Sequence, residues 1–174
     1  MIVLGLDPGT AITGYGVVAG EPHGVPRLIE CGVIRTPAHE PLPSRLRGIH
    51  EAVTELIARH RPHVLAIEDV FYAKNVRTTV VLGHARGVAM LAAAQAGIAV
   101  HEYAPASVKK SVCGTGSATK QQVQFMVTRL LRLTRAPEPA DAADGVAAAL
   151  AHLMGAHLAR IAARAAAPAR TARS

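Results

Sequence analysis

The chain has 174 residues, of which half are hydrophobic, 3% are aromatic and none is tryptophan. This length suits one domain with a core of aliphatic side chains, and the composition excludes a disordered chain. No apolar run reaches the ~20 residues of a membrane span, so we expect no membrane anchor and a cytoplasmic location.

The formal net charge is +7, from 19 Lys and Arg against 12 Asp and Glu. Such an excess favours a polyanionic partner, because phosphates that bind Lys and Arg release their counterions. A basic chain can also reflect solubility alone, so charge leaves both interpretations open. The two cysteines, Cys31 and Cys113, are far apart and belong to no metal-spaced cluster, and we expect free thiols.

The first part of the chain predicts a meander of three strands, then a helix and a fourth strand. We expect the strands at residues 2–6, 14–19, 27–36 and 63–68, and the helix at 44–60. Ser44 is the expected cap of this helix. The run that ends at Glu68 is apolar throughout, which is typical of a central strand covered on both faces.

The second part predicts further helices around one more strand. We expect a loop at 71–76, a helix from there to 96, a strand at 98–103, and helices at 105–112, 119–133 and 140–158. The helix that ends near residue 96 is apolar around much of its circumference and carries Gly83 and Gly87, which would let another element approach closely. We expect it to be buried or to form a dimer contact. The fold class is therefore α/β, with a mixed five-stranded sheet flanked by helices.

Four acidic residues stand where the predicted elements begin or end. Asp7 and Glu68 close the first and fourth strands, and Asp141 and Asp144 lie one helical turn apart on one face. Each alone has an ordinary explanation, such as a turn or a helix cap. Together they would repel one another and lose hydration unless cations neutralised them, so they predict a site for divalent metals.

The chemistry that suits such a site is phosphodiester cleavage. Two Mg²⁺ ions about 4 Å apart can share a carboxylate, activate a water and stabilise the leaving oxygen. Oxygen ligands suit Mg²⁺ or Mn²⁺, and the absence of Cys and His at these points disfavours zinc. Lys109, Lys110 and Lys120 flank a glycine-rich loop that suits phosphate contacts, although a solvated loop explains them too. That loop lacks the Walker A pattern, which excludes an NTP-binding loop.

In order and spacing, these motifs resemble those of the RuvC family of Holliday-junction resolvases, bacterial nucleases with an RNase H-like fold. The resemblance runs through residues 5–10, 67–75, 82–87, 108–120 and 141–145. It implies a nuclease domain over 1–157, followed by a basic, flexible tail over 158–174. It further implies a metal-dependent endonuclease that resolves four-way DNA junctions by paired symmetric nicks during recombination and repair, with two Mg²⁺ or Mn²⁺ ions in each active site.

The resemblance also implies residue roles and partners. The residues that match the family's metal-binding catalytic carboxylates are Asp7, Glu68, Asp141 and Asp144. Lys109 and Lys120 match lysines that contact DNA, Lys120 with a catalytic role, and Phe71 matches an aromatic wedge at the junction centre. Apart from the resemblance, Lys74 and Arg77 are candidate phosphate contacts by proximity in sequence, and Lys110 is one because it flanks the glycine-rich loop. The implied partners are a second copy of the chain, junction DNA, and the RuvA and RuvB branch-migration proteins.

The chain departs from many relatives beside the site, and some relatives carry histidine at the position of Asp141 or Asp144, where this chain has acids. Three further functions stay open. Asp69 stands where many relatives carry an amide, which alters the local charge. An actin-like ATPase lobe would also begin with a strand, an Asp and a glycine-rich turn, but it needs a second lobe. The same motifs would also suit a junction-binding scaffold without catalysis, or an RNase H-like nuclease that acts on ribosomal RNA.

Overall fold

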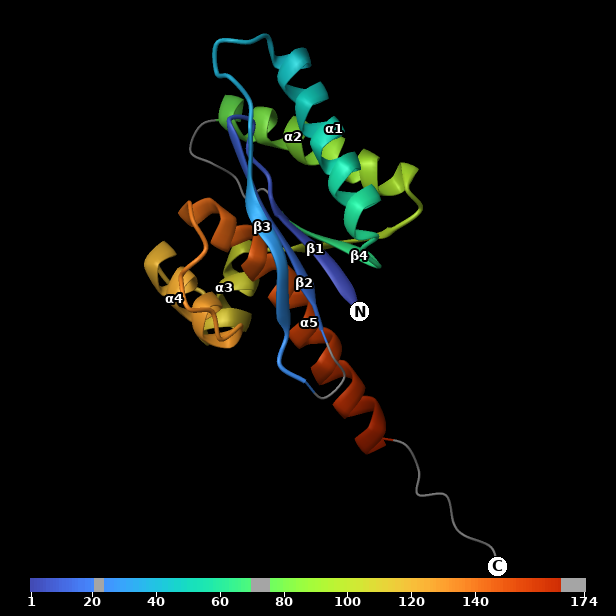
Figure 1. The fold of residues 1–174 in the computed structure, drawn as a ribbon, viewed down its shortest axis with the longest axis vertical. Coiled ribbons are helices and arrows are strands. Elements are labelled where there is room, and N and C mark those ends of the chain that lie inside the picture. The colour runs from blue at the N-terminus through green and yellow to red at the C-terminus, as the bar shows by residue number, and fades with distance from the viewer. Residues whose placement is uncertain (21–23, 70–75, 167–174) are drawn as a thin grey trace, which may run out of the picture.

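Five strands form one mixed sheet in the computed structural model, which describes residues 1–20, 24–69 and 76–166, with side chains as far as residue 157. The strands are β1 (Ile2–Asp7), β2 (Ile12–Ala19), β3 (Arg27–Arg35), β4 (Val64–Glu68) and β5 (Ala99–Tyr103). Their order across the sheet is β3-β2-β1-β4-β5 (Figure 1). β1, β2 and β3 run antiparallel, whereas β4 and β5 join β1 in parallel.

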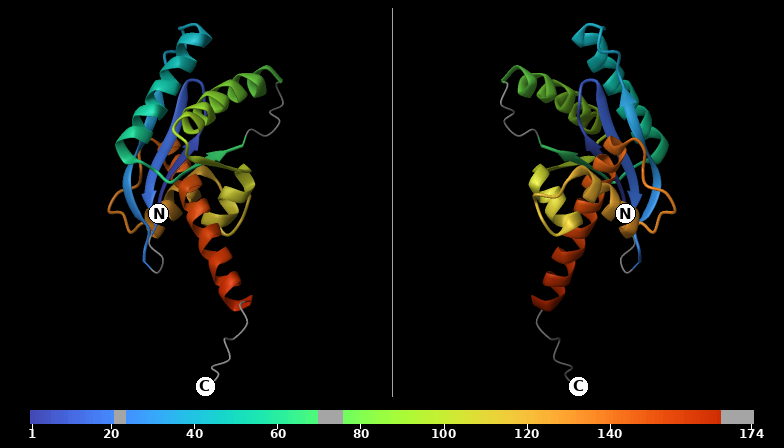
Figure 2. Two further views of the ribbon diagram at one scale, coloured as in Figure 1. Left: turned by 90° about the vertical axis from the view of Figure 1, so that its right-hand side faces the viewer. Right: turned by 90° about the vertical axis from the view of Figure 1, so that its left-hand side faces the viewer.

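Helices cover both faces of this sheet (Figure 2). They are α1 (Leu42–His60), α2 (Val76–Gln95), α3 (Pro105–Cys113), α4 (Lys120–Leu130) and α5 (Ala140–Ala166). Successive strand residues point to opposite faces. Leu4 and Leu6 of β1 therefore pack with α1 and α2, while Val3 packs with α3, α4 and α5 on the other face. The predicted fold class, a mixed five-stranded sheet flanked by helices, is confirmed.

Glycines let α5 lie directly against β1 and β2. A side-chain carbon added to Gly5 would lie 2.1 Å from the carbonyl oxygen of Gly145, and one added to Gly14 would lie 1.8 Å from that of Asp141. No larger residue fits at such separations without moving the backbone. Since Gly14 pairs with Asp7 in the β1–β2 register, this contact brings the first turn of α5 beside the end of β1.

Three helix boundaries differ from the sequence-based expectations. α1 begins before Ser44, and its N-cap is Pro41, which makes no side-chain capping bond; a proline in the first turn loses no helical hydrogen bond. α4 ends at Leu130 because the chain turns at Arg132, whose φ is +52°. The expected end of the last helix near residue 158 is also wrong. α5 continues to Ala166, since its alanine-rich sequence favours helix.

α2 is buried along one face and exposed along the other. Its buried residues are four alanines, Ala85, Ala89, Ala92 and Ala93. On the outer side, Val76, Val80 and Leu91 are 70%, 53% and 50% exposed, and a side chain added to Gly83 or Gly87 would meet no atom within 4 Å. No other described element of this chain approaches the two glycines, so the space beside them is open to a second copy.

Two further expectations concern the cysteines and the membrane. Cys31 and Cys113 are both free, as predicted. None of the helices in the described ranges has the length and apolarity needed to cross a membrane.

Candidate active site

Asp7 and Glu68 end neighbouring parallel strands and point to the same side of the sheet. The register pairs Leu6 of β1 with Ile67 of β4, so the two acids occupy the next position on each strand. By alternation, both carboxylates face α3, α4 and α5. Parallel pairing thus brings together two acids that are 61 positions apart in the sequence.

A buried threonine holds the turn that follows Asp7. The Thr13 hydroxyl donates to the carbonyl oxygen of Gly9 at 2.7 Å and accepts from the Gly9 amide at 3.2 Å. Thr13 itself is fully buried. Two hydrogen bonds to one residue fix the backbone between β1 and β2 and, with it, the direction in which Asp7 points.

The acids of α5 are paired with a lysine that begins α4. Nζ of Lys120 lies 3.1 Å from Oδ1 of Asp141 and 3.1 Å from Oδ2 of Asp144. A capping box sets the start of α4: the Thr119 hydroxyl accepts from the Gln122 amide, and the Gln122 side chain accepts from the Thr119 amide. Lys120 is thereby held at the point where it reaches both acids.

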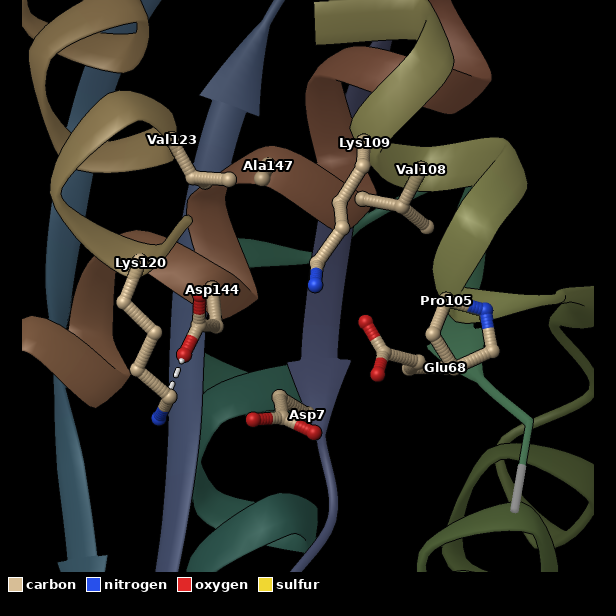
Figure 3. A pocket seen from close by; sticks show the side chains of 9 residues that line it. All are labelled: Asp7, Glu68, Pro105, Val108, Lys109, Lys120, Val123, Asp144 and Ala147. Carbon is tan, nitrogen blue, oxygen red and sulfur yellow. Dashed lines mark ion pairs between the residues drawn. The ribbon is translucent and has the colours of Figure 1, made fainter. Parts of the chain in front are cut away.

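These groups form one pocket between the strand ends and the helices (Figure 3). Its charged lining consists of Asp7, Glu68, Asp144, Lys109 and Lys120, and its remaining lining of Pro105, Val108, Val123 and Ala147. In the view of Figure 3, Asp7 lies between Asp144 and Glu68. The pocket volume is about 130 Å³.

The carboxylates of the pocket lack sufficient compensating charge. Burial, followed by the negative charge of Asp144, raises the pKa of Asp7 to about 6. Burial, with Asp7 and Asp144 nearby, raises the pKa of Glu68 to about 8. Burial also raises the pKa of Asp144, although Lys120 opposes this shift. Each of these acids would ionise more readily beside an additional cation.

The donor set fits a hard divalent cation. Carboxylate oxygens are the ligands that Mg²⁺ and Mn²⁺ prefer, and the raised pKa values identify a place where positive charge is favourable. Among the side chains that the structure describes, no group of three Asp, Glu, His or Cys is arranged closely enough to enclose an ion. The acids of α5 are instead directed to Lys120, whose ammonium supplies part of the missing charge.

The structure brings most of the predicted site residues together. The predicted residues that line the pocket are Asp7, Glu68, Asp144, Lys109 and Lys120. Asp141 lies at its edge, in contact with Lys120. Lys110 is exposed on α3 and is not among the lining residues. Phe71 and Lys74 lie outside the described residues.

Sequence reasoning missed a cluster of three aromatic rings around the buried His152, on the same face of the sheet as the pocket. Tyr103 pairs with Glu68 in the β4–β5 register, and its hydroxyl lies 2.8 Å from Nδ1 of His152 on α5. The His152 ring is 4.6 Å from that of His101, and its burial lowers the pKa of this histidine. The spacing of two helical turns between Asp144 and His152 is the only signal in the sequence that could have indicated it.

Comparison with known proteins gives concordant matches over most of the chain. Residues 3–152 match the family model described as "Crossover junction endodeoxyribonuclease RuvC". A protein of that name from Parafrankia is 50% identical over 172 residues, covering 98% of this chain and 96% of the relative. Another, from Pelotomaculum thermopropionicum, is 49% identical over 154 residues, covering 87% and 92%.

A solved structure matches with similar completeness. The RuvC protein of T. thermophilus, in complex with a Holliday junction substrate, superimposes with a TM-score of 0.86 at 37% identity. The match covers 91% of this chain and 96% of that one. The sheet and its helices are therefore arranged in the same way in both proteins.

Proposed function

The chain belongs to the RuvC family of crossover junction endodeoxyribonucleases, and from this premise we propose which residues carry its reaction. It has an RNase H-like fold and is an endonuclease that resolves four-way DNA junctions. Like the other nucleases of the family, it depends on metal. We further propose which metal it uses, how two copies assemble and which proteins it works beside.

The catalytic carboxylates of the proposal are Asp7, Glu68, Asp141 and Asp144. They would hold two Mg²⁺ ions, or Mn²⁺, which when bound would activate the attacking water and stabilise the leaving oxygen. The observation that supports this assignment is the raised pKa of three of these acids within one pocket. Buried acids that share a pocket without an equal number of cations are unfavourable unless further positive charge binds.

Lysines supply the positive charge that a DNA phosphate needs in this pocket. Lys120 contacts Asp141 and Asp144, and Lys109 lies close enough to Glu68 to lower its pKa against the effect of burial. Both ammonium groups would balance the charge of a phosphodiester that enters among the acids. Lys110, exposed on the outside of α3, would contact the DNA backbone further away, and Phe71 and Lys74 would complete the junction contacts.

The outer face of α2 is the proposed contact between two copies of the chain. Val76, Val80, Gly83, Gly87 and Leu91 are all exposed and follow one another at helical spacing. The glycines leave open space in which a second helix could approach closely. In a homodimer of this kind, a two-fold axis would relate the two active sites, which suits paired nicks in the two-fold symmetric junction.

The remaining parts of the proposal rest on the family resemblance and on the chain itself. RuvA and RuvB are the proposed partners in branch migration. The nuclease domain would span residues 1–157, which includes all of the matched range, and the tail would span 158–174, with its residues 158–166 forming the last part of α5. A cytoplasmic location is supported by the two free cysteines, which suit a reducing compartment.

Cleavage of a synthetic four-way junction tests the proposal. We expect the wild-type chain to nick two opposing strands in Mg²⁺ or Mn²⁺ and to cut nothing in EDTA. A linear duplex of the same sequence should stay intact, and it should bind more weakly at physiological salt. Cleavage in EDTA would contradict a metal-dependent site, and equal cutting of the linear duplex would contradict junction selectivity.

A further inference from the structure

An arginine on the opposite face of the sheet contacts two carboxylates behind the pocket. Nη2 of Arg86, on α2, lies 3.4 Å from Oδ1 of Asp69 and also contacts the carboxylate of Glu102. The Arg86 side chain is 18% exposed, whereas those of Asp69 and Glu102 are 46% and 49% exposed. The guanidinium is therefore largely withdrawn from water, and its charge is compensated by one acid directly after β4 and one acid within β5.

The sheet register places these acids at the strand ends that form the pocket. Glu102 pairs with Ile67, and Tyr103 pairs with Glu68. The Asp69 amide donates to the carbonyl oxygen of Tyr103 at 2.8 Å, which extends this pairing by one residue. By alternation, Asp69 and Glu102 face α2 while Glu68 faces the pocket. Arg86 thus connects the end of β4 to the end of β5 from behind.

Two sides of the pocket depend on these strand ends. Glu68 is the last residue of β4. α3 begins at Pro105, two residues after β5 ends at Tyr103, and contributes Pro105, Val108 and Lys109 to the lining. A shift of one strand end against the other would therefore change the spacing between the Glu68 carboxylate and the α3 side of the pocket.

We propose that Arg86 is a positioning residue for the metal site, which it serves by fixing the ends of β4 and β5 relative to each other through Asp69 and Glu102. It touches neither substrate nor metal. Nε and Nη2 of Arg86 are buried without a hydrogen bond to any described residue, and the ion pairs made by Nη2 compensate the charge of the guanidinium. This inference rests on the proposed function, because it presumes that Glu68 binds metal.

Direct binding of Mn²⁺ tests this role. Binding is measured by electron paramagnetic resonance on the metal-free full-length chain, without DNA. We expect Arg86→Met to weaken binding about tenfold, in the range found when partners behind metal ligands are removed. Arg86→Lys should restore part of the affinity, since an ammonium can pair with one carboxylate at a time. Arg47→Met is the matched control, because Arg47 is exposed on α1 and pairs with Glu51 one helical turn away.

Two readouts separate positioning from general stability. In junction cleavage, Arg86→Met should raise the half-saturating Mg²⁺ concentration by the same factor and leave kcat at saturating Mg²⁺ near the wild-type value. Thermal unfolding of each variant gives the temperature below which the variant is folded and these measurements are valid. If Arg86→Met does not fold, Arg86→Lys is compared with the wild-type chain in its place. Wild-type Mn²⁺ affinity in the Arg86 variants, with a lower unfolding temperature alone, would overturn the proposal.

Failure of the proposed function would give a different result. If Asp7→Asn binds Mn²⁺ as tightly as the wild-type chain, the carboxylates are not the metal site. The proposed function and the positioning role of Arg86 are then both overturned. If Asp7→Asn loses Mn²⁺ and Arg86→Met retains it, the metal site stands and the positioning role alone is overturned.

Discussion

The side chains of the pocket are held in an arrangement that a nearby cation would stabilise. Asp7, Glu68 and Asp144 share a partly buried space, and the two lysines that line it do not offset the effect of burial on their pKa values. Lys120 is the residue with the most direct influence on them, because it contacts Asp144 and Asp141. Removal of this lysine, or a change in the protonation of the acids, should therefore change the balance of charge in the pocket.

Replacement of Lys120 by Met should lower kcat for junction cleavage by about 100- to 1,000-fold, as when one preorganised electrostatic contact to the transition state is lost. Lys110→Met is the matched control, since Lys110 is exposed and does not line the pocket. It should weaken junction binding and reduce its salt dependence by about one counterion while kcat is retained. Single-turnover cleavage at saturating protein measures the rate of each variant, and titration of the junction at several salt concentrations measures binding. A wild-type rate for Lys120→Met would remove this lysine from the mechanism.

The stability of the metal-free chain should fall as pH rises. Unfolded carboxyl groups have pKa values near 4. Asp7 and Glu68 have values of about 6 and about 8 in the folded chain, which therefore binds protons more tightly than the unfolded one. Their contribution to stability is complete below about pH 4 and is lost as pH rises through 6 and 8.

Thermal unfolding in EDTA between pH 5 and 8 measures this effect. We expect a falling unfolding temperature for the wild-type chain and a flatter profile for the Asp7→Asn, Glu68→Gln double variant. Added Mg²⁺ should raise the unfolding temperature more at pH 8 than at pH 6, because protons then compete less for the carboxylates. Identical profiles for the two proteins would show that these acids do not control the pH dependence.

Among the secondary-structure elements, the crossing of α5 over β1 and β2 determines where the α5 acids lie. The crossing depends on Gly14 and Gly5, which contact the backbone of α5 at Asp141 and Gly145. A methyl group at Gly14 would overlap with the Asp141 carbonyl, so the first turn of α5 would have to move away from Asp7.

Gly14→Ala should therefore destabilise the chain by about 1–3 kcal/mol and sharply reduce cleavage, because it separates the acids of α5 from Asp7. Gly48→Ala is the control: it lies within α1, where an added carbon would meet Thr36 at an ordinary 3.7 Å. That change should stabilise the chain by roughly 0.5–1 kcal/mol. Chemical denaturation gives both free energies of unfolding. Equal stability for Gly14→Ala and wild type would contradict the tight crossing.

Local patterns in the sequence were sufficient to predict most elements, but not the contacts between them. The apolar runs that end at Asp7 and Glu68 predicted two strands whose acids converge, and parallel pairing confirms this. The close contact at Gly14 could not be predicted, because no local pattern identifies which element will cross it. The ion pairs of Arg86 could not be predicted either, because its partners Asp69 and Glu102 lie in other parts of the sequence.

At the scale of the whole molecule, the two sides of the sheet differ in the side chains that they present. Helices α3, α4 and α5 lie on one side of the sheet and α2 lies on the other (Figure 2). The first three line the acidic pocket, whereas exposed apolar side chains follow one another along the outer face of α2. Val80 and Leu91 belong to that face and are at least half exposed. Exposed apolar side chains that continue along one helix are typical of a protein interface.

Val80→Glu should dissociate the proposed dimer, because a second copy would place the new charge in an apolar contact. Sedimentation velocity should give a monomer for this variant and a dimer for the wild-type chain at the same concentration. Arg47→Glu on the exposed surface of α1 serves as a charge-changing control and should remain dimeric. A wild-type chain that sediments as a monomer at micromolar concentration would contradict the α2 interface.

In the proposed mechanism, four acids from distant parts of the chain hold the metal ions of one nuclease site. An anomalous-scattering crystal structure of the chain in Mn²⁺, bound to a four-way junction, locates those ions directly. We expect Mn²⁺ peaks between Asp7, Glu68 and the two acids of α5, beside a phosphate of the junction, and their loss in Asp7→Asn. Mn²⁺ bound elsewhere on the chain, with these carboxylates free of metal beside the DNA, would contradict the mechanism.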